Sequence, residues 1–281
     1  EMLRSLVGSE MCIRDSIDGT LLNSQGEITD RTKKALEDAL KEGNIVVIAS
    51  GRDPKGVFQY AKILKLDEYD GLLSNYNGAR ITNYESMEII INHTLDLDDM
   101  KELLEFSEDL DDMNYTIYYD GKCYTNSMDT YRLEDTQKKN DMELIYDPDL
   151  SYNVDFEPNN VLFACHPDKI SEPLNKIHDK FSDKFTLVKS TPYYYEVMPK
   201  GVSKGESLKE IAKYYDIAME DVIAFGDEDN DLSMIEAAGV GVVMANGSKA
   251  MLRAADYVTL SNDEDGIADY LEKFVLKKEE N

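Results

Sequence analysis

The alternation of short apolar runs with amphipathic stretches constrains the fold of this chain more than any other feature. After residue 195 the pattern predicts, in alternation, helices over 203–215, 230–238, 248–255 and 264–275 and strands over 222–226, 240–244 and 257–260. Residues 29–42 also have a helical period, and the apolar run 45–49 suits a strand buried on both faces. Such alternation indicates an α/β protein with a parallel sheet covered by helices on both sides.

The middle of the chain has a different pattern, with hairpin signals and aromatic strands. Residues 115–119 and 122–125 flank an Asp120-Gly121 pair that is typical of a tight hairpin turn. Further helices are expected near 96–110 and 168–181, and further strands near 160–165 and 185–190. We therefore predict a core formed by residues 1–82 and 190–281, interrupted by an inserted α+β module at 83–189.

The charge and cysteine content narrow the classes of partner. The net charge is -27, from 30 basic and 57 acidic residues, so we expect no nucleic-acid partner and no binding to anionic membranes. No apolar stretch approaches the roughly 20 residues of a membrane span, and no secretory signal is recognisable. The three cysteines are far apart and suit a reducing compartment, so the sequence predicts a cytoplasmic protein. It leaves the oligomeric state open.

Polar groups follow several predicted strands, at the sheet edge where ligands of such folds bind. The richest segment is Gly226-Asp227-Glu228-Asp229-Asn230-Asp231, which follows the strand 222–226. Asp227 and Asp231 could supply the carboxylate oxygens that Mg²⁺ prefers. The alternative is that Asp229, Asn230 or Asp231 merely caps the next helix.

The first loop, Ser16-Ile17-Asp18-Gly19-Thr20, could address a phosphate. Side chains of a strand alternate, so positions 16 and 18 point to the same side. Gly19 would permit close backbone approach and Thr20 would supply a hydroxyl donor. Taken alone, Asp18-Gly19 is more often a plain turn.

Two further loops suit an anionic ligand. Ser50 directly follows the buried strand in the segment Ser50-Gly51-Arg52, where its hydroxyl could donate to a phosphoryl oxygen. Lys204 follows Ser203, a predicted N-cap, so its ammonium would lie beside a helix N-terminus that already favours anions. Each residue alone is typical of an ordinary solvated loop.

The four loops, in this order, resemble those of the haloacid dehalogenase superfamily and its Cof-type sugar-phosphatase branch. The resemblance runs from about Asp18 to the end of the chain and includes the segments 74–79, 196–199 and 244–247. It implies a Rossmann-like core with an inserted, mobile α+β cap that determines substrate choice. It also implies Mg²⁺ as cofactor and a small phosphorylated metabolite as partner.

The resemblance also assigns roles to residues. In the family the first loop reads Asp-x-Asp-Gly-Thr, in which the first aspartate forms an aspartyl-phosphate and the second acts as acid and base. Asp18 matches the second, Ser50 and Lys204 match the phosphate-holding groups, and the metal ligands would be Asp18, Asp227 and Asp231. Substrate contacts implied by resemblance are Thr20, Gly51, Arg52, Asn77, Asn230 and Asn246.

The N-terminus departs from this pattern, because Ser16 occupies the position of the nucleophile. Residues 8–16 are also too polar for the buried strand that we expect there, and residues 5–16 resemble an adapter-derived sequence found at the ends of translated metagenomic reads. Asp15 would point to the opposite face. We interpret the segment as an artefact that replaced an apolar strand ending in aspartate.

These patterns predict a Mg²⁺-dependent phosphatase that hydrolyses small phosphomonoesters, either sugar phosphates or phosphorylated cofactors. As written, with Ser16, its activity should be very weak. A phosphosugar mutase resembling phosphomannomutases is an alternative, because both chemistries begin with the same phosphoenzyme. A catalytically silent protein that binds phosphorylated ligands is the other alternative.

Overall fold

The computed structural model describes residues 12–134 and 142–277, and residues 12–16 by their backbone alone. The chain divides into two compact units, one formed by the segments up to Ile90 and from Ser203 onward, and the other by Ile91–Val202. The insertion expected at 83–189 therefore begins and ends later. The reason is that β4 and β5 join the first sheet, whereas the unpredicted strand β11 joins the second. Residues 5–11 of the adapter-like string lie outside the described residues.

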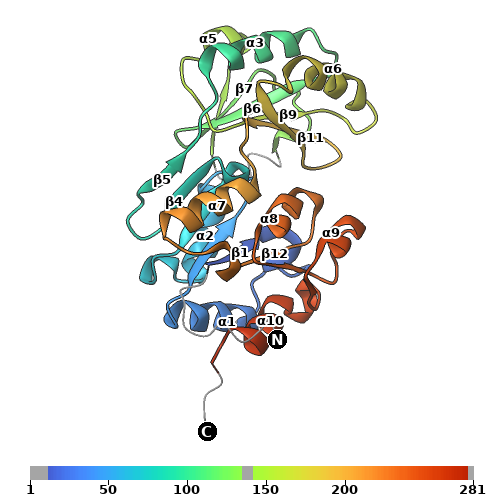
Figure 1. Cartoon of the computed structure of the whole chain (residues 1–281). Coiled ribbons are helices and arrows are strands. Elements are labelled where there is room, and N and C mark those ends of the chain that lie inside the picture. The colour runs from blue at the N-terminus through green and yellow to red at the C-terminus, as the bar shows by residue number, and fades with distance from the viewer. Residues whose placement is uncertain (1–11, 135–141, 278–281) are drawn as a thin grey trace. The chain divides into compact units, whose positions relative to one another are not determined.

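The first unit is built on a sheet of eight strands in the order β14-β13-β12-β1-β2-β3-β4-β5 (Figure 1). The strands are β1 (Cys12–Ser16), β2 (Ile45–Ala49), β3 (Leu72–Asn75), β4 (Arg80–Asn83), β5 (Ile89–Asn92), β12 (Val222–Gly226), β13 (Val240–Val243) and β14 (Tyr257–Val258). Strands β14 to β3 are parallel, and β4 pairs antiparallel with β3. This confirms the predicted α/β class with a Rossmann-like parallel core.

Helices flank this sheet. They are α1 (Asp30–Lys41), α2 (Lys55–Ile63), α7 (Lys204–Tyr214), α8 (Leu232–Ala237), α9 (Lys249–Ala254) and α10 (Gly266–Phe274). Short turn segments are η1 (Ile17–Leu21) and η3 (Tyr76–Gly78), which contain residues with non-helical backbone angles, and η2 (Leu66–Glu68), η4 (Met219–Asp221), η5 (Asp229–Asp231) and η6 (Asn262–Glu264). Apolar faces of α1, α2 and α10 form one hydrophobic cluster with β2 and β12, whereas α8 contacts β12, β13 and α7.

Local sequence explains the first helix and strand. Thr29 caps α1 by accepting from the Thr32 amide, and the predicted apolar face, Ala35, Leu36, Ala39 and Leu40, is buried. All five residues of β2 are buried, as expected for a strand covered on both sides.

Strand β1 differs from the expectation that residues 8–16 are too polar for a central strand. Its backbone pairs in parallel with β12 on one side and β2 on the other, with Cys12 opposite Val222 and Ser16 opposite Ala49. A central position satisfies the backbone N–H and C=O groups on both edges whatever the side chains are. The apolar neighbouring strands therefore impose the strand conformation on a polar segment.

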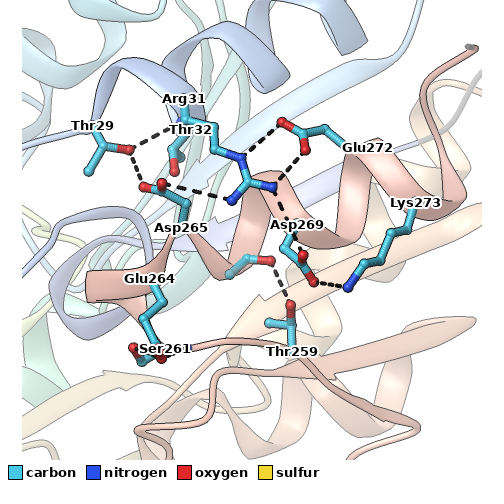
Figure 2. A network of polar contacts seen from close by, with 11 residues as sticks. Thr29, Arg31, Thr32, Thr259, Ser261, Glu264, Asp265, Asp269, Glu272 and Lys273 are labelled. Carbon is cyan, nitrogen blue, oxygen red and sulfur yellow. Dashed lines mark hydrogen bonds and ion pairs between the residues drawn. The ribbon is translucent and has the colours of Figure 1, made fainter.

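A polar network joins α1 to α10, which lie next to each other (Figures 1 and 2). The Arg31 guanidinium donates to both carboxylate oxygens of Glu272, at 3.1 and 2.7 Å, and lies 4.0 Å from Asp265 and 3.9 Å from Asp269. The Thr29 hydroxyl donates to Asp265 at 2.5 Å. These contacts join two helices that are far apart in the sequence, adjacent in space and held mainly by their shared hydrophobic cluster.

The second unit has its own sheet, in the order β10-β11-β9-β6-β7-β8. Its strands are β6 (Asn114–Tyr119), β7 (Lys122–Thr125), β8 (Glu143–Tyr146), β9 (Val161–Ala164), β10 (Phe185–Lys189) and β11 (Tyr194–Pro199), and its helices are α3 (Leu97–Glu108), α5 (Leu150–Asn153) and α6 (Ser171–Phe181). The predicted hairpin is confirmed by antiparallel pairing of β6 with β7. Side chains of α3 and α6 form a second hydrophobic core with β6, β9 and β11.

None of the helices within residues 12–134 and 142–277 combines the length and the apolar composition of a bilayer-spanning segment.

Candidate active site

The loop after β1 is joined to the loop after β12 by direct contacts. The hydroxyl of Thr20 donates to Oδ1 of Asp227 at 2.6 Å, across 207 residues of sequence. Gly19 has φ 74°, and a Cβ atom there would lie only 2.0 Å from Oδ2 of Asp227. Glycine is therefore required at this position by both conformation and space.

Asp227 is a buried carboxylate, with 5% of its surface exposed. The pKa of Asp227 is raised to about 7, mainly by burial and also by the charges of Asp231 and Glu228. The Thr20 hydrogen bond and the Lys204 ammonium lower the pKa of Asp227 and offset part of this effect. A site with these properties favours either a proton or a cation beside Asp227.

A buried ion pair lies next to this carboxylate. Lys204, at the first position of α7, donates from Nζ to Oδ1 of Asp231, and the side chains are 2% and 0% exposed. The other oxygen of Asp231 accepts from the Asp227 amide at 3.3 Å. Ser203 caps α7 by accepting from the Glu206 amide, as the sequence predicted for the N-cap.

The loop after β2 holds Ser50 and Arg52. Ser50 is buried, and its Oγ accepts from the Arg52 amide at 3.0 Å. The Arg52 guanidinium donates from Nη2 to both oxygens of Asp18, at 2.7 and 2.8 Å. Asp18 has an extended backbone, and 71% of its side chain is exposed.

The other residues predicted to contact substrate lie in or beside the same loops of the first unit. Asn246 donates from Nδ2 to the Gly19 carbonyl at 2.8 Å, and Asn77 is buried and donates from its amide to the Ser50 carbonyl at 3.0 Å. Asn230 lies in η5 and is half-buried, as is Gly51. Ser16 ends β1 opposite Ala49.

The first unit thus gathers the loops after β1, β2 and β12 and the start of α7 around two contact centres. Thr20, Asp227, Asp231 and Lys204 form one, and Asp18, Ser50 and Arg52 form the other. Asp53 and Tyr76 were not singled out from the sequence, although the tyrosine hydroxyl donates to the buried aspartate next to Arg52. The sequence signal for Asp53 was its place before Pro54 at a helix start.

Mg²⁺ binds oxygen ligands, often one or two protein carboxylates together with water and substrate oxygens. Asp227 supplies a buried carboxylate, with the carboxylates of Asp231 and Glu228 and the Lys204 ammonium as its charged neighbours. Asp231 already accepts from Lys204 and from the Asp227 amide, and position 16 supplies no carboxylate. Within the described parts of the chain, no three His, Cys, Asp or Glu side chains are grouped to hold a metal. Among the described residues of this site, Asp227 is the buried carboxylate that keeps an oxygen without a hydrogen bond and could contribute to binding Mg²⁺.

The first unit thus has a Rossmann-like parallel core with carboxylates and a serine after its strands and a buried lysine at the start of α7. The model of the haloacid dehalogenase-like hydrolase family matches residues 15–271, and the chain belongs to that family. The resemblance described from the sequence is thereby confirmed.

Relatives match along nearly the whole chain. A candidate phosphatase of Streptococcus pyogenes serotype M6 is 34% identical over 262 residues, covering 92% of this chain and 96% of its own length. The 5-amino-6-(5-phospho-D-ribitylamino)uracil phosphatase YitU of Bacillus subtilis is 30% identical, covering 92% and 95%. A crystal structure of a haloacid dehalogenase-like hydrolase from Bacteroides thetaiotaomicron superimposes with a TM-score of 0.84 at 30% identity, covering 94% and 99%.

Proposed function

We propose that this chain has the framework of a Mg²⁺-dependent phosphatase for small phosphomonoesters, with its nucleophile position altered. The observation that carries the proposal is the buried group formed by Thr20, Asp227, Asp231 and Lys204, because it combines a fixed ammonium with a carboxylate poised for a cation. Family membership and the phosphatase names of relatives support the same reaction class.

The phosphate would be held by Lys204 and Ser50. Lys204 is anchored by Asp231 at the start of α7, where the helix N-terminus adds a favourable field for an anion. Ser50 can turn its hydroxyl toward a phosphoryl oxygen while its Oγ still accepts from the Arg52 amide. Such preorganised donors stabilise developing charge without reorganisation during the reaction.

Asp18 would act as acid and base toward the leaving oxygen, and its exposed carboxylate is accessible to a substrate. Asp227 would hold Mg²⁺, with Asp18 and Asp231 as further candidate ligands. When bound, the ion would neutralise charge on the phosphoryl group. Substrate contacts are assigned to Thr20, Gly51, Arg52, Asn77, Asn230 and Asn246.

The substrate is a small phosphorylated metabolite in this proposal, and the unit Ile91–Val202 would select it as a cap. The similarity to YitU, whose name specifies a phosphorylated ribitylaminouracil, makes a phosphorylated cofactor precursor as reasonable a substrate as a sugar phosphate.

A second candidate function follows from Ser16. The family's chemistry needs an aspartate there to form the aspartyl-phosphate, and a serine without a neighbouring base is a poor nucleophile. A protein that retains Lys204, Ser50 and Asp227 but lacks the nucleophile would bind phosphorylated ligands without turning them over.

The test is phosphate release from p-nitrophenyl phosphate, a panel of sugar phosphates and the phosphorylated ribitylaminouracil, with Mg²⁺ and with EDTA. The chain is compared with Ser16→Asp and with the uncharged control Ser16→Asn. We expect Mg²⁺-dependent turnover in Ser16→Asp that exceeds the other two by about 100-fold or more, since loss of a nucleophile commonly costs several orders of magnitude. Turnover absent from all three, together with thermal stabilisation by the same phosphorylated compounds, would favour the silent binding protein.

A further inference from the structure

A strained turn is hydrogen-bonded to the loop that carries Ser50 and Arg52. The three residues of η3, Tyr76, Asn77 and Gly78, have φ values of 52°, 55° and 102°. The left-handed region is unfavourable for a bulky residue such as tyrosine. Strain of this kind persists only where surrounding contacts impose it, and it is concentrated at functional sites.

Buried contacts hold this turn in place. Tyr76 is 2% exposed, and its hydroxyl donates to Oδ2 of Asp53, which is itself buried. Oδ1 of Asp53 accepts from the Lys55 amide at 2.9 Å. Burial raises the pKa of the Asp53 carboxyl, whereas these two hydrogen bonds lower it because they favour the ionised form. The Asp53 side chain therefore ties η3 to the first turn of α2.

The same turn also holds the backbone on either side of Gly51. The Arg52 carbonyl accepts from the Asn75 side chain at 3.0 Å and from the Tyr76 amide at 3.4 Å. The Ser50 carbonyl accepts from the Asn77 amide at 3.0 Å. The Ser50 and Arg52 carbonyls are thus both held by hydrogen bonds from residues 75–77.

Gly78 extends the connection to α7. A Cβ atom on Gly78 would lie 2.3 Å from Oγ of Ser207 and 2.9 Å from the Ser203 carbonyl. The turn therefore packs directly against the start of the helix that carries Lys204.

The Arg52 side chain, whose backbone these contacts hold, forms an ion pair with Asp18. Its side chains are 18% and 71% exposed, and a pair this accessible gains little from attraction alone, because ordering two side chains costs entropy. Its geometry then depends on how firmly the Arg52 backbone is anchored. The Asn75 side chain and the Tyr76 amide donate to the Arg52 carbonyl, and Asp53 in turn accepts from the Tyr76 hydroxyl.

We propose that Tyr76 and Asp53 are positioning residues that hold Arg52 against Asp18. Their consequence for catalysis rests on the proposed function, because it requires Asp18 to be the acid and base. The positioning of Arg52 does not rest on the proposed function, so it can be tested in the chain with Ser16 in place.

The first test is ¹⁵N–¹H NMR of the Arg52 guanidinium, assigned with Arg52→Lys. The matched pair is Tyr76→Phe and Tyr84→Phe, because the Tyr84 hydroxyl donates to the Phe58 carbonyl, outside this loop. We expect a distinct, slowly exchanging Arg52 signal in the parent chain and in Tyr84→Phe, and an exchange-averaged signal in Tyr76→Phe. An unchanged signal in Tyr76→Phe would overturn the proposal. If Tyr76→Phe does not fold, Asp53→Asn serves the same comparison.

The second test is kinetic and uses Ser16→Asp as the background. Tyr76→Phe should lower kcat about tenfold with little change in KM, because small displacements of catalytic groups have effects of at least that size. In an Arg52→Ala background it should cause no further loss, since residues acting through one another are not additive. An additive loss would refute positioning through Arg52. A Ser16→Asp chain without activity would count against the proposed function alone, and the NMR result would still decide the positioning.

Discussion

Asp227 should make the stability of the first unit depend on pH in a direction opposite to that of an ordinary salt-bridged aspartate. Its folded pKa of about 7 lies above the ordinary aspartate value of 3.8, so between these pH values the folded state holds a proton that the unfolded state releases. The stability associated with this proton is fully present below pH 3.8 and is lost as the pH rises through about 7. The difference of roughly three pK units corresponds to at most about 4 kcal/mol.

The assay is thermal unfolding in EDTA between pH 5 and pH 8, comparing the chain with Asp227→Asn. Asparagine can still accept from the Thr20 hydroxyl but cannot ionise. We expect the melting temperature of the parent to fall relative to the variant by several degrees over this range, because 1 kcal/mol corresponds to about 2–4 °C in a chain of this size. Mg²⁺ should restore part of the loss in the parent and none of it in the variant.

Parallel pH profiles for the two proteins would refute this reasoning, because they would show that Asp227 is ionised in the folded state at no cost. Stabilisation of both proteins by Mg²⁺ would show that the ion acts elsewhere.

Two further substitutions test the packing of the site. Gly19→Ala should destabilise the fold by about 2 kcal/mol or more, because its Cβ would meet Asp227. The control Gly26→Ala, also at positive φ but with nothing within 4 Å, should destabilise it less. Equal shifts in melting temperature would contradict the role of the close approach. Lys204→Met should lower the free energy of unfolding by about 3–5 kcal/mol, because it leaves the buried Asp231 without its ion-pair partner. Lys209→Met removes only an exposed pair with Glu206 and should lower it by under about 1 kcal/mol. Comparable losses in denaturant titrations would show that burial of the Lys204–Asp231 pair does not matter.

Much of the fold could be predicted from the sequence because local patterns determine it. The period of the apolar residues predicted α1, the uninterrupted apolar run 45–49 predicted the burial of β2, and the Asp120-Gly121 turn predicted the β6–β7 hairpin. Motif spacing likewise predicted which loops would carry polar groups. These features depend on neighbours within a few residues, so a single sequence contains them.

Other features were decided only by tertiary structure. Cys12–Ser16 forms a strand despite its polarity, because β2 and β12 supply hydrogen-bond partners on both sides. The need for glycine at position 19 comes from Asp227, and the anchoring of Arg52 comes from Tyr76. The sequence by itself determined the parallel core and its polar loops, whereas contacts between residues distant in the chain determined which carboxylate is buried, which is paired and which is exposed.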